Sequence, residues 1–361
     1  MVTALKTSIN ILLVFLFAAC TSVPDERMTP YVDFPETREL TARTLSLDSA
    51  LFRYPYRVRV QDDKAVVLDL HGTEYFFHAF HYPGFHYLSS FGKRGDAPEE
   101  MLSAENLRWN GNFLWTLDSN KSELTRLGFA SSGDSLLRLE AVSLDEELLR
   151  ALDFVQYDDS TFIIPDYSGD SRFCLVSRQG KLLHKIGTIP TTDEDALKNA
   201  HPALAQAWRS FIDYNPRNGV LAAVTQLGEV LEIYNLKDST HIVRIGPNGE
   251  PEFQISQGYG IPTGIMGFSD IQVTDSAIYV VFQGRAFKDI MQKAQQGINL
   301  PDGGQNIYVF SLEGKPLRKY VLDHYIHGIS VDEQKGIIIA TDVNKDCLLY
   351  TSPSPRDVEE S

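Results

Sequence analysis

Aspartates end several of the apolar strands that the sequence predicts, and they are well placed to do chemistry together. Asp69, Asp118 and Asp166 each follow a run of apolar residues, at equivalent places in successive repeats. Carboxylates displayed at one height and radius could meet in an axial pocket, bind a cation or polar ligand, or raise one another's pKa for acid–base work. The alternative is that each aspartate accepts hydrogen bonds from the backbone N–H groups of its own turn.

Histidines form two groups in the chain. Four lie between residues 71 and 86, including His78 and His81, whereas His324 and His327 come late in the sequence. Neutral imidazoles bind zinc or copper, but residues three apart on a strand point to opposite faces. We therefore predict no metal site. His324 and His327 join the three aspartates as candidate residues of a central channel or ligand site.

Motifs of the common catalytic and cofactor sites are absent from the sequence. It contains no Gly-x-Ser-x-Gly elbow, no phosphate loop, no His-Glu-x-x-His helix and no pair of Cys-x-x-Cys motifs. We therefore assign no catalytic residue and expect no cofactor. The chain carries 48 acidic against 33 basic residues and a net charge of −15. Because nucleic-acid binding needs clustered Lys and Arg, nucleic acid is not an expected partner.

Short strands separated by turns must position these candidate residues. Between residues 45 and 346 one order recurs: an entry strand, an apolar strand closing on a polar residue, an alternating strand, a Gly turn and an exit strand. The first halves of the six units contain Tyr56, Leu107, Leu152, Phe211, Ile271 and Ile329. A spacing of roughly 50 residues is typical of four-stranded blades. We predict an all-β fold, a six-bladed β-propeller, in preference to a pair of β-sandwiches.

Two segments with helical patterns interrupt the repeats. One spans residues 192–210, with Thr192 as its expected N-cap. The other spans residues 285–296 and ends at Gly297. One face of the second helix would carry Ala286, Phe287, Ile290, Met291 and Ala294. We expect each insertion to pack on a propeller face and shape a groove there, although a loop decoration without a ligand is the alternative.

The N-terminus has the pattern of an export signal. Residues 1–19 combine Lys6 with an apolar run too short to span a bilayer. The Ala-Ala-Cys ending at Cys20 resembles a bacterial lipobox, which implies that Cys20 is lipidated and that acyl chains are the membrane anchor. An ordinary cleaved signal is the alternative. We expect residues 20–44 to be a tether, and the missing aspartate after Cys20 favours an outer-membrane lipoprotein of the cell envelope.

The C-terminal segment has an unusual sequence. Cys347–Asp357 resembles the conceptual translation of a sequencing-library adapter, and a natural Pro/Ser-rich tail is the alternative. We therefore expect residues 347–361 to be a non-native tail outside the fold. The last blade would then be truncated, with an open edge.

A resemblance to a known family rests on the segment Leu88–Met101. Its residues Phe91, Gly92, Arg94, Gly95, Pro98 and Glu100 resemble the signature that follows the first blade of TolB-like six-bladed propeller lipoproteins of the Gram-negative envelope. The resemblance covers nearly the whole mature chain and implies a propeller fold. It brings no established catalytic residues. Asp96, Ala97 and Glu99 stand where the family often has small residues or glycine, which could alter the backbone turn.

Two hypotheses about function remain open at this point. The first is a lipid-anchored binding module whose loops engage an envelope protein or a glycan-type ligand, with an unknown oligomeric state. The second is a metal-assisted hydrolase or lactonase that uses carboxylates at the mouth of the channel. Convergence of Asp69, Asp118, Asp166, His324 and His327 would favour the enzyme, and their dispersal in turns would disfavour it.

Overall fold

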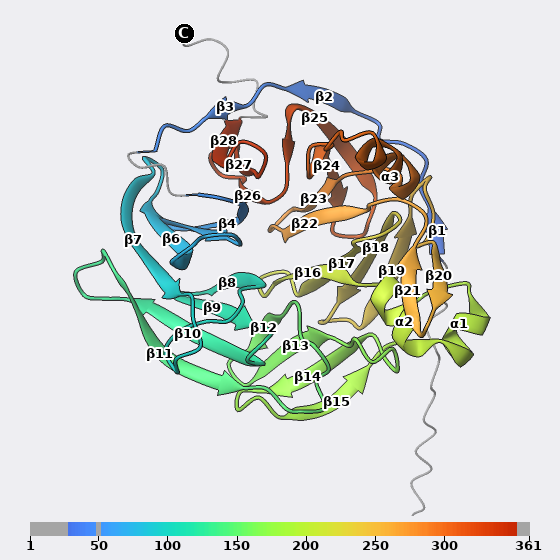
Figure 1. Cartoon of the computed structure of the whole chain (residues 1–361), viewed down its shortest axis with the longest axis horizontal. Coiled ribbons are helices and arrows are strands. Elements are labelled where there is room, and N and C mark those ends of the chain that lie inside the picture. Colours follow the sequence, from blue (N-terminus) through green and yellow to red (C-terminus); the bar gives the residue numbers. More distant parts are fainter. Residues whose placement is uncertain (1–27, 48–51, 352–361) are drawn as a thin grey trace, which may run out of the picture.

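Six sheets, each built on an antiparallel meander, stand around a central axis in the computed structural model, which describes residues 28–47 and 52–351 (Figure 1). In each sheet the first strand lies nearest the axis, and the second strand is strongly apolar because neighbouring sheets cover both of its faces. All six residues of the second strand in the fourth blade, Val220–Thr225, are buried. The predicted fold class, an all-β propeller of six blades with short helical insertions, is confirmed.

The strand bounds follow the predicted repeats. Blade 1 contains β4 (Pro55–Gln61), β5 (Lys64–Asp69), β6 (Tyr75–His81) and β7 (His86–Lys93), and blade 2 contains β8 (Asn106–Asn110), β9 (Phe113–Asp118), β10 (Glu123–Phe129) and β11 (Leu136–Ser143). Blade 3 contains β12 (Val155–Asp158), β13 (Thr161–Pro165), β14 (Phe173–Ser177) and β15 (Leu182–Ile186). Blade 4 contains β16 (Ser210–Asn215), β17 (Val220–Thr225), β18 (Val230–Asn235) and β19 (Thr240–Ile245). Blade 5 contains β22 (Phe268–Val273), β23 (Ala277–Phe282), β24 (Gly304–Ser311) and β25 (Pro316–Ile326), and blade 6 contains β26 (Ile329–Asp332), β27 (Ile337–Asp342) and β28 (Cys347–Thr351).

The hydrophobic core lies between successive blades. Trp115 of blade 2 and Phe162 of blade 3 pack edge to face, with ring centroids 5.0 Å apart. Val58 and Val67 of blade 1 share a buried cluster with Ile339 of blade 6, so the first and last blades are in contact. Each blade is thus stabilised by apolar contacts with its neighbours, as expected of radial repetition.

The N-terminal segment differs from the expected tether. It forms β1 (Met28–Pro30), β2 (Thr37–Leu40) and β3 (Arg43–Thr44), which pair in turn with the outer strands of blades 4, 5 and 6 (Figure 1). Tyr31 and Phe34 between β1 and β2 are buried in the core. The sequence pattern missed these strands because each is short and pairs only at a sheet edge, where no apolar period is imposed.

Blade 6 also differs from the expectation of a truncated blade with an open edge. Cys347–Thr351 forms β28 between β27 and β3, and Leu348 and Leu349 are fully buried. The chain therefore closes its ring with a strand from the N-terminus as the outermost strand of the last blade. The residues after Thr351 lie outside the described part, and an adapter origin of Cys347–Asp357 stays a prediction.

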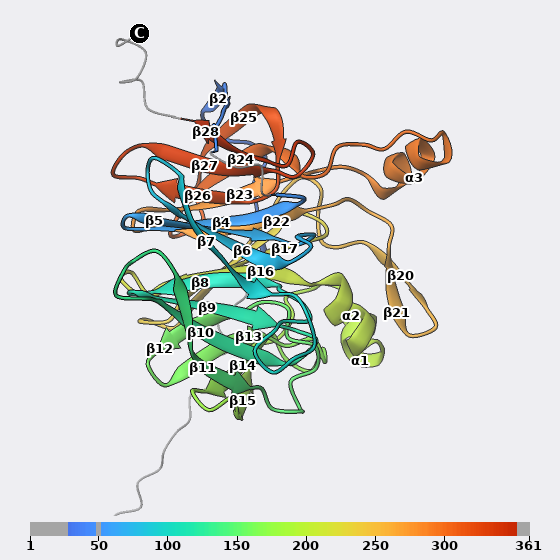
Figure 2. The same ribbon diagram turned by 60° about the vertical axis from the view of Figure 1, so that its left-hand side comes forward.

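The insertions gather on one face of the propeller, which we call the helical face (Figure 2). This is the face at which the innermost strands begin, and its insertions are α1 (Glu194–Asn199), α2 (His201–Ala207), the hairpin of β20 (Phe253–Ser256) and β21 (Tyr259–Pro262), and α3 (Phe287–Gln295). The opposite face, where the innermost strands turn into the second strands, is called the turn face.

The first insertion contains two helices rather than one. Asp193, not Thr192, is the N-cap of α1, because its carboxylate accepts a hydrogen bond from Ala196 N at 2.9 Å. The Thr192 hydroxyl instead donates to Glu250. A new helix then begins with Pro202 in its first turn, a position at which proline lacks no needed N–H.

Helix α3 does not pack against the propeller as expected. It projects from the helical face (Figure 2), and none of its residues is buried. Met291 is 61% exposed. Within the described residues no helix has the length and apolarity needed to cross a membrane. The predicted export signal and Cys20, the predicted lipidation residue, lie outside the described residues.

Candidate functional site

The three aspartates of the sequence hypothesis cap turns, and the structure does not bring them together as ligands. Asp69 accepts hydrogen bonds from Tyr54 N at 2.7 Å and Arg53 N at 2.9 Å, so it joins the end of β5 to the segment entering β4. Asp118 accepts from Leu102 N at 2.7 Å and from Asn120 N at 3.0 Å. These bonds are the alternative role considered for the aspartates.

Asp166 has the same role in blade 3. It accepts hydrogen bonds from Ser168 N at 3.0 Å and Ser171 N at 3.2 Å, and it forms an ion pair with Lys185 at 3.1 Å. Across residues 28–47 and 52–351, no group of three or more His, Cys, Asp or Glu side chains is arranged to hold a metal ion. The carboxylate cluster required by the hydrolase hypothesis is therefore not found in the described residues.

The two late histidines also lie in different surroundings. His324 pairs with the adjacent Asp323, with 2.8 Å between Nδ1 and Oδ1. His327 is buried near the axis, with its Nδ1 3.0 Å from Arg57 Nη1 and its ring centroid 4.3 Å from that of Tyr56. Burial and the nearby Arg57 charge lower the pKa of His327 to about 3, so the ring is neutral at physiological pH.

The signature loop after blade 1 has a structural role. Arg94 donates from Nε to Gly72 O at 3.0 Å and from Nη2 to Leu70 O at 2.7 Å, and its guanidinium lies over the Phe76 ring. These contacts fasten the end of β7 to the loop between β5 and β6. Phe91 stacks on Phe77 with centroids 5.1 Å apart.

The remaining signature residues close the loop on itself. Gly92 has φ +65°, and a Cβ there would approach the Phe77 ring to 2.6 Å, so only glycine fits without strain. Glu100 accepts from Lys93 Nζ at 2.7 Å and from Ala97 N, and these bonds hold its pKa below the ordinary value. Gly95 lies directly against the Glu100 carboxylate, and Pro98 O accepts from Arg138. The signature therefore stabilises a turn rather than forming a ligand site.

Charged side chains that sequence reasoning did not single out meet around the axis. Asp270 at the inner edge of blade 5 accepts from Arg59 Nη1 at 3.0 Å and Nη2 at 2.8 Å, a bidentate pair with blade 1. Arg57 Nε lies 3.2 Å from the same carboxylate. Although burial alone would raise the pKa of Asp270, Arg57 and Arg59 hold it well below its ordinary value.

A second group of ion pairs, centred on Arg108, joins blades 2, 3 and 4. Arg108 Nη2 lies 3.1 Å from Asp153 Oδ1, and Arg108 Nη1 lies 3.5 Å from Asp213 Oδ1. Arg108 also donates to Ile212 O. Burial raises the pKa of Asp213 despite the opposing effect of Arg108 and Arg59, so its charge is only partly compensated.

These three aspartates also connect blades 3, 4 and 5 to the blades that follow them. Asp153 accepts from Ile212 N, Asp213 from Val273 N and Asp270 from Ile329 N, at 2.9, 2.7 and 2.8 Å. Each bond runs from a side chain at the inner edge of one blade to the innermost backbone of the following blade. Three junctions between inner strands are thereby held by hydrogen bonds as well as by apolar packing.

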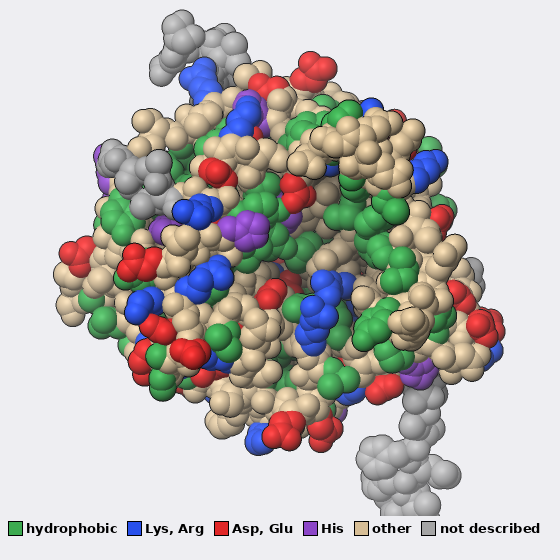
Figure 3. Space-filling view, viewed as in Figure 1, with side chains coloured by type: hydrophobic (Ala, Val, Ile, Leu, Met, Phe, Trp, Pro, Cys, Tyr) green, Lys and Arg blue, Asp and Glu red, His purple; other side chains and the backbone are tan. Residues whose placement is uncertain are grey.

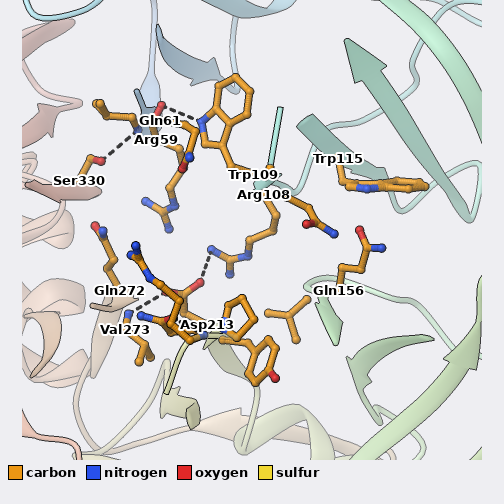
Figure 4. Close-up of a pocket in the computed structure, with 18 residues that line it drawn as sticks. Arg59, Gln61, Arg108, Trp109, Trp115, Gln156, Asp213, Gln272, Val273 and Ser330 are labelled. Atoms are coloured by element: carbon orange, nitrogen blue, oxygen red, sulfur yellow. Dashed lines mark hydrogen bonds and ion pairs between the residues drawn. The ribbon is translucent and has the colours of Figure 1, made fainter. Parts of the chain in front are cut away.

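A pocket of about 370 Å³ opens at the turn-face mouth of the axis (Figure 4). Its polar lining includes Arg59, Gln61, Arg108, Gln156, Asp213 and Gln272, and Trp109 forms one wall. Two buried polar atoms in this lining make no hydrogen bond among the described residues. They are the acceptor Oε1 of Gln156 and the donor Nη1 of Arg108, which has only its 3.5 Å ion-pair contact with Asp213 Oδ1. An unsatisfied donor and an unsatisfied acceptor at one pocket are complementary to a group that both accepts and donates, such as a hydroxyl.

Comparison with known proteins gives the family. The family model described as "TolB-like 6-blade propeller-like" matches residues 33–334. The chain belongs to this TolB-like propeller family. No curated protein matches the sequence significantly.

Solved structures of low sequence identity share the fold of this TolB-like propeller. A candidate exported protein from Bacteroides fragilis has a TM-score of 0.58 at 10% identity, covering 90% of this chain and 99% of its own. A member of the DUF4221 family from Bacteroides vulgatus has a TM-score of 0.53 at 10% identity, with 87% and 96% covered. An auxiliary nutrient binding protein from Bacteroides ovatus has a TM-score of 0.52 at 10% identity, with 84% and 70% covered.

The axial charges of this TolB-like propeller left a signal in its sequence. Arg57 and Arg59 alternate with Tyr56, Val58 and Val60 in the inner strand of blade 1. Asp213 and Asp270 occupy the same strand of later repeats. A charge repeated at the entry strand of several blades indicates an axial position, because that strand lies nearest the axis in every blade.

Proposed function

We propose that this protein is a ligand-binding propeller of the bacterial cell envelope, and that it holds a glycan-type ligand in the turn-face pocket. The observation that carries the proposal is that two buried atoms of one open polar pocket make no hydrogen bond among the described residues. They are Gln156 Oε1 and Arg108 Nη1, the latter with only a 3.5 Å ion-pair contact to Asp213. Buried polar groups are normally satisfied, and a ligand hydroxyl would satisfy both kinds of atom.

The rest of the pocket has the chemistry of a sugar site. Amide side chains of Gln61 and Gln272 and the partly compensated carboxylate of Asp213 provide further donors and acceptors. Trp109 is anchored by donating from Nε1 to Arg59 O at 3.3 Å, so its ring is a fixed surface on which a pyranose could stack. Side chains held in place before binding reduce the entropy lost on association.

Two further observations support an envelope location. One similar structure is described as an exported protein and another as a nutrient binding protein, and both are propellers of Bacteroides species. In this chain the Ala-Ala-Cys ending at Cys20 would place the propeller on a lipid anchor. We propose an outer-membrane lipoprotein whose contact with the membrane is the acylated Cys20.

A glycan array followed by calorimetry tests the binding site. The probes are neutral oligosaccharides, and the variants are Gln156→Ala and a matched control, Gln292→Ala, on the exposed surface of α3. Losing one ligand hydrogen bond should weaken binding by about 3- to 10-fold. We expect that loss for Gln156→Ala and unchanged affinity for the control. No bound glycan, or equal affinities of both variants and the parent, would refute the site.

Fatty-acid labelling tests the anchor. In a Gram-negative host fed an alkyne fatty acid, the parent chain should carry the label and sediment with the outer membrane. Cys20→Ser should lose both properties. A labelled Cys20→Ser variant, or an unlabelled parent chain, would contradict the lipobox interpretation.

A further inference from the structure

A second pocket lies on the helical face, away from the turn-face pocket. It has a volume of about 170 Å³ and is lined by Leu149, Arg150, Leu152, Tyr167, Pro202, Gln206, Arg209, Gly258 and Tyr259. Its walls come from the segment before blade 3, from the loop after β13, from α2 and from the hairpin of β20 and β21. We call it the α2 pocket. Figure 3 shows Lys and Arg side chains gathered in the hollow beside the centre of this face.

The insertions hold the α2 pocket in shape. The Oε1 atom of Gln206 on α2 accepts a hydrogen bond from Gly260 N of the hairpin at 3.1 Å, which braces one insertion against the other. The amide Nε2 of Gln206 is left as a donor. Gly260 lies so close to α2 that a Cβ there would meet Ala203 O at 2.6 Å. The pocket is therefore a product of tight packing between two insertions that the basic blade repeat lacks.

The two arginines of the α2 pocket have no directly paired carboxylate among the described residues. Neither Arg150 nor Arg209 forms an ion pair or a side-chain hydrogen bond in the described part of the chain, and no carboxylate lines the pocket. The buried Arg172 nearby shows the contrast, because Glu232 pairs with it at 2.6 Å. An uncompensated guanidinium is notable in a chain of net charge −15.

Two buried polar atoms of the α2 pocket have no hydrogen-bond partner within residues 28–47 and 52–351. They are Arg209 Nε and Tyr167 Oη. Burial is the main cause that raises the pKa of Tyr167, so its hydroxyl is protonated at physiological pH and can donate. Leaving buried donors unsatisfied is unfavourable, and an acceptor supplied by a ligand would remove that penalty.

We propose that the α2 pocket binds the carboxylate of a small ligand, with Arg209 and Tyr167 donating to its two oxygens and Gln206 donating at the rim. The planar guanidinium fork matches a planar carboxylate. Leu149, Leu152 and Tyr259 provide apolar contacts for the carbon body that carries the carboxylate. This site lies at the other end of the axis from the proposed glycan pocket and does not depend on it.

Calorimetry or NMR titration of the full chain tests the proposal with two sources of carboxylate. Methyl glucuronide represents an acidic sugar and N-acetylalanine represents a peptide C-terminus. Methyl glucoside and N-acetylalaninamide are their neutral counterparts, and inorganic phosphate is a non-carboxylate anion. We expect at least one carboxylate probe to bind and its neutral counterpart to bind at least 10-fold more weakly. The tighter carboxylate identifies the source.

Variants then assign the binding to named atoms. Arg209→Gln should weaken the carboxylate probe at least 10-fold, and Tyr167→Phe, which keeps the ring, should weaken it several-fold. Lys198→Gln on α1 removes the same charge from an exposed position and is the matched control with unchanged affinity. The proposal is overturned if no carboxylate probe binds, if phosphate binds as tightly, or if Arg209→Gln and Lys198→Gln have equal affinities. Unchanged melting temperatures establish that the variants remain folded.

Discussion

Asp270→Asn should destabilise the propeller more than any surface substitution of equal size. The carboxylate is about 1% exposed, and it compensates Arg57, which is fully buried, and Arg59, which is nearly so. The Asn side chain has nearly the same shape but no charge, so two guanidinium groups would lose their counter-ion inside the protein. It would also present an NH₂ group to one of them.

The magnitude follows from the burial of the pair. Breaking a buried ion pair by removing one partner costs about 3–5 kcal/mol. A domain of this size has an unfolding entropy on the order of 0.7 kcal/mol per kelvin, so the melting temperature should fall by about 4–7 °C. The matched control is Glu36→Gln, which breaks the partly exposed ion pairs of Glu36 with Arg318 and Arg38. It should change the free energy of unfolding by only about 0–1 kcal/mol.

The pH dependence gives an independent check on the cause. Because the pKa of Asp270 is lowered in the folded state, its stabilisation is complete above the unfolded pKa of about 4 and is lost as the pH falls through the folded pKa. The difference in free energy of unfolding between the parent and Asp270→Asn should therefore become smaller below about pH 4. Thermal and urea unfolding at pH 7 and pH 3.5 measure it. Equal losses for Asp270→Asn and Glu36→Gln at pH 7, or a gap that does not narrow in acid, would refute the reasoning.

Three more predictions follow from buried or strained positions. Burial lowers the pKa of His327 to about 3, so neutral His327 stabilises the fold above its unfolded pKa of about 6.5, and this stabilisation is lost as the pH falls toward 3. Between those pH values the free energy of unfolding of the parent should fall by up to about 1.4 kcal/mol per pH unit. Urea unfolding of His327→Gln should show a shallower dependence of this free energy on pH. Gly92→Ala should lower the free energy of unfolding by about 2–4 kcal/mol, because the new Cβ would meet the Phe77 ring. Gly111 has a similar φ and open space around it, so Gly111→Ala should lower the same quantity by only about 1 kcal/mol. Equal losses for the two variants in urea unfolding would argue against the contact with Phe77. Leu349→Ala in β28 should lower the free energy of unfolding by about 2–5 kcal/mol, and an unchanged value would show that this adapter-like segment does not pack as the structure has it.

Much of the architecture could be predicted because each blade carries its own pattern. The second strands are buried on both faces, so they appear as continuous apolar runs such as Ala65–Leu68, and they mark the repeat directly. Strands β1, β2 and β3 had no such mark. They add to the edges of finished sheets, where pairing depends on the neighbouring backbone and not on a side-chain period.

The candidate site was harder to predict, because its contacts, like the pairing of the edge strands, depend on neighbours from distant parts of the chain. The aspartates at strand ends were visible in the sequence, but their partners turned out to be the N–H groups of nearby segments, as for Asp69 and Tyr54. The residues that do meet at the axis are far apart in the chain. Arg59 and Asp270, 211 positions apart, pair only because the ring closes.

The number of blades, the turns between strands and the place of the helical insertions could be predicted from the chain alone, because these depend on local burial and backbone geometry. The acidic balance follows from composition. Which charges are paired, in contrast, depends on the folded ring. Six inner strands converge on one axis, and this brings Arg108 to Asp153 and Asp213 while Arg209 is left beside Tyr167 without a counter-charge. Whether a charged side chain is compensated or available to a ligand depends on neighbours from other blades, and that neighbourhood exists only once the ring is closed.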